Sequence, residues 1–146
     1  MKGNRNIKSA IGIDPQSITG AAAPGTEVKG PAIDRKGFEE ALVTLQHGAC
    51  SEGGTLQCKV QESNTTTDGD FADITGAAFA DLVIGAGVTS GVYAGRLNLA
   101  GRKRYIRVVT TLVGATETAL VSALVSLHQA KDLPVSQVNA LAFNVS

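Results

Sequence analysis

The stretch from Thr55 to Ser63 constrains the fold most strongly, because its apolar and polar residues alternate one by one. The apolar positions of the alternation are Leu56, Cys58 and Val60, and the polar positions are Gln57, Lys59 and Gln61. A period of two is typical of a β-strand with one face in the core and the other in water. We therefore predict a half-buried strand over residues 55–63.

Further strand candidates recur along the chain and are separated by turns rich in Gly, Asp and Asn. They are residues 26–29, 38–46, 91–99, 104–113 and 119–127. The runs 38–46 and 119–127 also permit helical spacing, but the connector Gly114–Thr118 suits a hairpin and favours a strand after it. Strands at regular short intervals indicate an antiparallel sandwich. The predicted fold is all-β: two antiparallel sheets of roughly four strands each, jelly-roll-like.

The first 25 residues look different from the rest. Pro15, Pro24 and the run Gly20–Ala23 disfavour regular structure, so at most one short strand is expected there. We predict an extended N-terminal arm over residues 1–25 and a single β-sandwich domain over residues 26–146, since 146 residues suit one domain. The arm carries basic residues expected to contact another subunit. They are Lys2, Arg5 and Lys8.

Composition excludes several classes of protein. Thirteen Lys and Arg balance thirteen Asp and Glu, which argues against a general nucleic-acid binder. No apolar run is long enough for a membrane span, and no apolar region follows the basic N-terminus, so neither a membrane protein nor a secretory signal is expected. Cys50 and Cys58 flank a Gly53-Gly54 turn and are expected to be reduced thiols.

The segment Gly85–Gly91 resembles the glycine loop of a dinucleotide-binding motif. Its context does not fit, because a strand rather than a helix is predicted after it. No acidic residue lies about 20 positions further on to bind a ribose. We interpret the segment as a flexible loop, and a nucleotide-binding enzyme remains only an alternative.

No catalytic, cofactor or metal site is expected from the other polar residues. His47 and His128 stand apart from other ligand types at metal-binding spacing. Asp68, Asp70 and Asp73 resemble the start of a calcium loop, but the later glycine and glutamate of an EF-hand are missing. A solvated acidic turn is the better interpretation.

Charges are separated along the chain. Residues 62–81 contain five acids and no base, and residues 96–107 contain five bases and no acid. The bases are Arg96, Arg102, Lys103, Arg104 and Arg107. Two interpretations stay open: solvated surfaces with salt bridges inside one subunit, or complementarity to a neighbouring copy or another protein surface.

Four segments occur in a recurrent order: Ile33–Phe38, Gln61–Ser63, Asp70–Asp73 and Gly101–Arg107. In this order they resemble the small decoration, or cement, proteins of tailed-bacteriophage heads, over about residues 30–127. The resemblance implies a non-enzymatic β-sandwich made in the bacterial cytoplasm. It would bind the major capsid protein on the capsid exterior, stabilise the shell, and associate as dimers or trimers. The eight basic residues named above are then the expected capsid or inter-subunit contacts, and another phage component of the neck or tail is the alternative.

Overall fold

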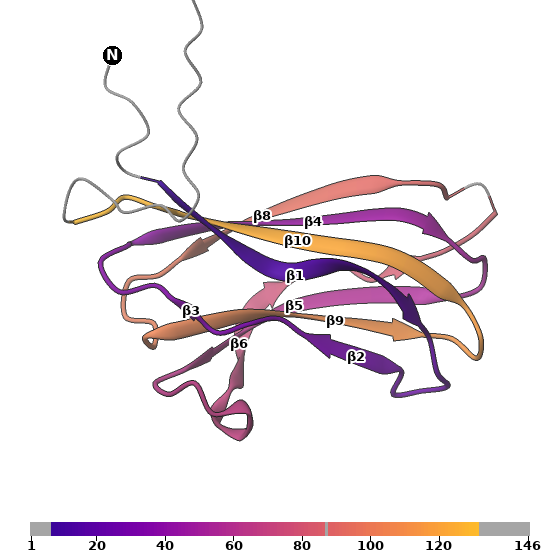
Figure 1. Cartoon of the computed structure of the whole chain (residues 1–146), viewed down its shortest axis with the longest axis horizontal. Helices are drawn as coiled ribbons and strands as arrows, with labels where there is room; N and C mark the ends of the chain where they lie inside the picture. The colour runs from indigo at the N-terminus through magenta and orange to yellow at the C-terminus, as the bar shows by residue number, and fades with distance from the viewer. Residues whose placement is uncertain (1–6, 87, 132–146) are drawn as a thin grey trace, which may run out of the picture.

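A computed structural model describes residues 7–86 and 88–131, and this part of the chain is almost entirely β-structure (Figure 1). The strands are β1 (Lys8–Thr19), β2 (Thr26–Lys29), β3 (Ile33–Asp34), β4 (Glu40–Cys50), β5 (Thr55–Ser63), β6 (Ala72–Ala78), β7 (Leu82–Val83), β8 (Gly91–Asn98), β9 (Tyr105–Val113) and β10 (Thr118–His128). A short 3-10 turn, η1 (Asp68–Asp70), precedes β6.

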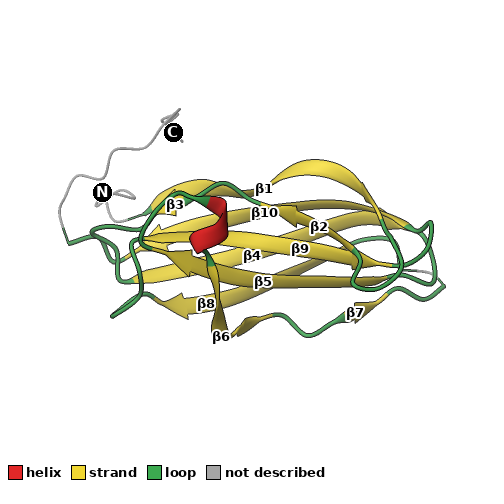
Figure 2. Ribbon diagram, turned by 90° about the horizontal axis from the view of Figure 1, so that it is seen from below, coloured by secondary structure: helices red, strands yellow, loops and turns green. Residues whose placement is uncertain are grey.

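The strands form two antiparallel sheets that pack face to face (Figure 2). Sheet A has the order β1-β10-β4-β8, and sheet B has the order β2-β9-β5-β6, with β3 beside β9 and β7 beside β5. When β2 with β3 and β6 with β7 are each taken as one strand, the orders become 1-8-3-6 and 2-7-4-5. This arrangement of eight strands is a jelly roll, so the predicted fold class is confirmed.

The strand predictions hold where the alternation is clear. The strand predicted over Thr55–Ser63 is β5 with the same bounds, and the ambiguous run 119–127 lies in β10. The inner faces of both sheets fill the core with β-branched residues and leucine. On β9, the core residues are Ile106, Val108 and Leu112, whereas Arg107 lies on the opposite face.

The prediction of an N-terminal arm with at most one short strand is wrong for the part that the structure describes. β1 is 12 residues long and pairs with β10 of the same chain, and its Ile13 and Ile18 are buried in the core. Pro15 is tolerated because β1 is an edge strand and its register with β10 shifts around this residue. Lys2 and Arg5 lie outside the described residues. Residues 132–146, the last part of the predicted domain 26–146, lie outside them as well.

Two glycines allow β1 to approach the segment that follows β2. A Cβ atom on Gly30 would lie 1.7 Å from the carbonyl oxygen of Gly12. The amide of Gly30 also donates a hydrogen bond to the Val108 carbonyl, at 2.8 Å. Residue 30 therefore connects β9 to β1 through contacts that only a glycine permits.

We predict that Gly30→Ala lowers the free energy of unfolding by at least about 1–3 kcal/mol, because backbone would have to move to admit the methyl group. Chemical denaturation measures the change. Gly69→Ala is the matched control, since no atom lies within 4 Å of a Cβ at that position. Equal stability of the two variants would contradict the close approach of Gly12 and Gly30.

We further predict that Ile106→Ala costs about 2–5 kcal/mol of stability, because the side chain is fully buried between the sheets. Val83→Ala, at an exposed position, should change stability by no more than about 0.5 kcal/mol. A loss below about 1 kcal/mol for Ile106→Ala in urea denaturation would show that this face of β9 is not core.

Candidate functional site

The bases between residues 96 and 107 gather around the end of the sandwich where β8 ends and β9 begins. Arg96 lies on β8, Arg102 and Lys103 in the turn between the strands, and Arg107 on β9. Lys8 at the start of β1 lies at the same end, because it pairs in register with Leu127 near the end of β10. We call this the basic end.

Arg107 is not available to a partner, because it is buried on the outer face of sheet B with only 6% of its surface exposed. Its Nε donates to Gln61 Oε1 at 2.8 Å, and its Nη1 donates to Asp68. The guanidinium lies over the ring of Phe71, 4.1 Å from the centroid, a favourable cation–π geometry. Arg107 therefore fastens the segment between β5 and β6 onto sheet B.

The other arginines of the basic end also pair within the chain. Arg104 donates through Nε and Nη2 to Asp34 Oδ2, at 3.2 and 2.8 Å, and the bond lowers the pKa of the Asp34 carboxyl. Arg102 lies 3.6 Å from Glu62, whose carboxylate also accepts the amide of Lys103 at 3.0 Å.

Arg96 lies 3.3 Å from Glu40 and stays largely exposed. The structure therefore shows the first of the two interpretations of the charge pattern, salt bridges inside one subunit.

The aspartates that resemble a calcium loop serve the same internal network. Asp68 accepts from Arg107 and also from Lys29 Nζ at 2.9 Å, and these bonds lower its pKa. Asp73 accepts from Gln61 at 2.7 Å and from Lys59 at 3.0 Å, which lowers its pKa as well. In residues 7–86 and 88–131, no three or more His, Cys, Asp or Glu side chains come together in a metal-binding group.

The structure brings His47 and Cys50 together, which the reading of the sequence missed. Both lie on β4, and His47 Nδ1 is 3.6 Å from Cys50 Sγ. Burial raises the pKa of the Cys50 thiol, and it raises that of the Cys58 thiol to about 12. Both cysteines are free, and the raised pKa values favour the neutral thiol over the reactive thiolate.

The segment Gly85–Gly91 does not have the surroundings of a dinucleotide-binding loop in the described part of the chain. Residues 85–90 connect β7 to β8, so a strand follows the glycines and not the helix that a dinucleotide-binding loop requires. Among the residues described, no helix is long and apolar enough to cross a membrane.

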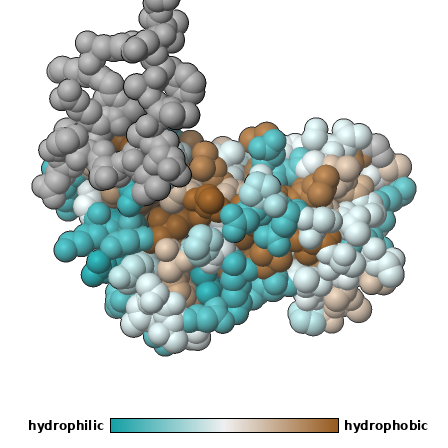
Figure 3. Space-filling view, in the orientation of Figure 1, coloured by the Kyte–Doolittle hydropathy of each residue, from teal (hydrophilic) through white to brown (hydrophobic). Residues whose placement is uncertain are grey.

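The outer face of sheet A is the most distinctive surface. Four large apolar side chains on it are 46–65% exposed. They are Ile11, Val92, Leu120 and Leu124. We call this surface the apolar face. Figure 3 shows brown, apolar patches with teal, hydrophilic residues between them along the middle of the view, where Figure 1 places β1 and β10.

The apolar face is interrupted by polar side chains and is partly hollow. Ile11 pairs in register with Leu124, and the strands alternate so that Thr44, Gln46 and Ser122 lie between the apolar side chains. A hollow of about 260 Å³ lies beside β1, where Ile11 and Pro15 form part of its lining. The outer face of sheet B, by contrast, carries the charged network around Arg107. The outer face of sheet A is therefore more apolar than that of sheet B, although the ion pair Glu40–Arg96 lies at one end of it. Exposed apolar side chains gathered on one face mark a candidate protein-binding surface.

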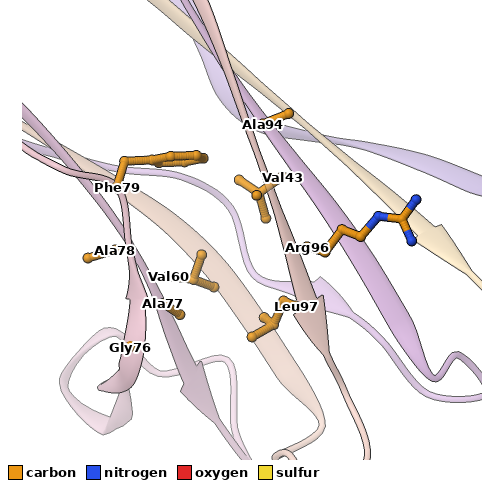
Figure 4. A pocket seen from close by; sticks show the side chains of 10 residues that line it. Val43, Val60, Gly76, Ala77, Ala78, Phe79, Ala94, Arg96 and Leu97 are labelled. Carbon is orange, nitrogen blue, oxygen red and sulfur yellow. The ribbon is translucent and has the colours of Figure 1, made fainter.

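A second apolar feature lies at the side of the sandwich, between the edge strands β6 and β8. It is a pocket of about 140 Å³ (Figure 4). Val43 and Leu97 line it from sheet A, Val60 lines it from β5 of sheet B, and Phe79 lines it from the segment directly after β6. Its lining carries no catalytic group: Arg96 is the one charged residue of the pocket, and its guanidinium points away in Figure 4.

Comparison with known proteins finds likeness in fold alone. No protein-family model and no curated protein matches the chain. Among solved structures, the infectious bursal disease virus VP2 subviral particle matches with a TM-score of 0.61 and 10% identity over 88% of this chain. The Gx strain of the same virus gives 0.58 and 15% over 84%.

The chain spans about a third of the length of these viral proteins, 33% and 32% respectively. The described sandwich therefore shares the β-sandwich fold of proteins from virus particles.

Acid should weaken the hydrogen bonds that Asp68 accepts from Arg107 and Lys29 in a defined pH range. The pKa of Asp68 is lowered from 3.8 in the folded chain, so its bonds stabilise the fold above that value and are lost as the pH falls through the lower, folded value. We predict that stability falls below about pH 4 and that Asp68→Asn reduces this fall. Thermal unfolding between pH 2 and pH 7 measures it, and an unchanged pH profile in the variant would contradict the role of Asp68.

Proposed function

We propose that this chain is a non-enzymatic structural protein of a phage virion that binds the outside of the assembled capsid and stabilises it. The observation that carries the proposal is the combination of a jelly roll with one outer face that exposes four large apolar side chains, Ile11, Val92, Leu120 and Leu124. Two findings support it: the likeness in fold to proteins of a virus particle, and the resemblance of the sequence to decoration proteins of phage heads.

The apolar face is the surface that meets the major capsid protein in this proposal. Apolar contacts suit it because burying such side chains against a partner supplies most of the affinity of a protein interface. The arginines of the basic end are engaged with acids of the same chain, which reduces what they gain from an external partner.

We assign the basic end a second role, in which Lys8, Arg96, Arg102 and Lys103 orient the approach to an acidic surface. Arg107, which was expected to make such a contact, is buried and acts within the fold. Arg104 pairs with Asp34 but is half-exposed, and it stays among the proposed contacts. A neck or tail component remains the alternative function, and the number of copies per virion distinguishes the two. Hundreds of copies would favour decoration, and about a dozen would favour the neck.

We predict that Leu124→Asp weakens binding to undecorated heads at least about tenfold, because a charge would be buried in the centre of the interface. Sedimentation of purified protein with heads measures the binding. The double variant Arg102→Glu/Lys103→Glu is the comparison: it should slow attachment at low salt and matter little at high salt, since exposed charges are screened. Full binding by Leu124→Asp would remove the apolar face from the proposal.

A further inference from the structure

Three of the four strands at the edges of the described sandwich carry features that block pairing with another strand. β1 contains Pro15 and two shifts of register against β10. β2 has only four residues and is followed by Pro31. β6 has a shift of register against β5 and contains Gly76 at a φ of 81°. These are the devices by which natural sheets avoid edge-to-edge association.

β8 is the edge strand without such protection. Its eight residues run in unbroken register with β4, from Gly91 opposite His47 to Asn98 opposite Glu40. It contains no proline, and Arg96 is its single charged residue. Within the described residues no strand pairs with its outer edge. The edge therefore presents a row of backbone donors and acceptors that an added strand can satisfy.

The pocket between β6 and β8 lies directly beside this edge. Gly95 has no side chain, and Phe79 lies near it, so that an apolar hollow of about 140 Å³ remains between the sheets (Figure 4). An apolar cavity of about 150 Å³ accommodates a benzene molecule. The pocket is thus large enough for one aromatic ring carried by a strand that adds to β8.

The chain itself contains a segment that fits these requirements. After Lys131 it continues to Ser146, and the sequence Asn139–Val145 alternates between larger apolar residues and small or polar ones. The larger residues are Leu141, Phe143 and Val145, and no charged residue follows Asp132. Residues 132–146 can reach about 50 Å when extended, enough to bridge to an adjacent molecule.

We propose that residues 139–145 of a second copy of this chain add as a strand to the outer edge of β8, with Phe143 in the pocket beside Phe79. The proposal rests on the proposed function, and it names a contact for the association as dimers or trimers that the resemblance to decoration proteins implies. Copies that lie side by side on a shell hold this segment at high effective concentration near β8 of a neighbour. The backbone supplies hydrogen bonds, and the alternate side chains supply specificity.

The test uses the full-length protein alone, without heads. We expect wild type to self-associate, as measured by light scattering over a range of concentrations, with slow hydrogen exchange of residues 91–98. Phe143→Asp should weaken self-association at least about 10- to 100-fold, the equilibrium cost of losing one buried phenylalanine. Exchange at residues 91–98 should then become fast. Asn144→Asp is the matched control, because it adds the same charge on the other side of the alternation and should behave as wild type.

Two results would overturn the proposal. A monomeric wild type with slow exchange at β8, lost in Phe143→Asp, would mean that the segment pairs with its own chain. Exchange at residues 91–98 that is unaffected by Phe143→Asp would mean that the segment does not bind this edge. Since no capsid is present, a failure of head binding leaves this result unaffected, and the two proposals are tested separately.

Discussion

The structure depends on the opposite use of the two faces of β9. One face places Ile106, Val108 and Leu112 between the sheets, and the other places Arg107 on the outer surface, where it binds Asp68 and Gln61. The strand also pairs with β2, β3 and β5. A shift of one residue would place the guanidinium between the sheets and the core side chains on the outer face, so the alternation fixes the register of sheet B.

The fold could be predicted where neighbouring residues carry the information. The alternation in Thr55–Ser63 gives β5 its exact bounds, and the β-branched residues before Val113 indicate β9. β1 could not be predicted in the same way, since the effect of Pro15 depends on its position at a sheet edge. That position is set by pairing with β10, which is more than 100 residues away in the chain.

The candidate site was less predictable for the same reason. The separation of acids and bases was evident from the sequence, but whether they meet one another or another molecule depends on the fold. The strands β5 and β3 and the turn η1 bring Glu62, Asp34 and Asp68 to the arginines, so most of the charge is used internally. The apolar face was missed because Leu120 and Leu124 fit both a helix and a strand. Its members lie on one face only when β1, β10, β4 and β8 pair in this order in sheet A.

The contact between Gly12 and Gly30 has a mechanical consequence. Two connections resist a force applied at the N-terminus of β1. The first is the hydrogen-bonded pairing of β1 with β10. The second is the close packing of Gly12 against Gly30, whose amide is hydrogen-bonded to Val108 of β9. Peeling β1 from the sandwich therefore requires both to yield together, and a pull on the first strand is distributed into both sheets.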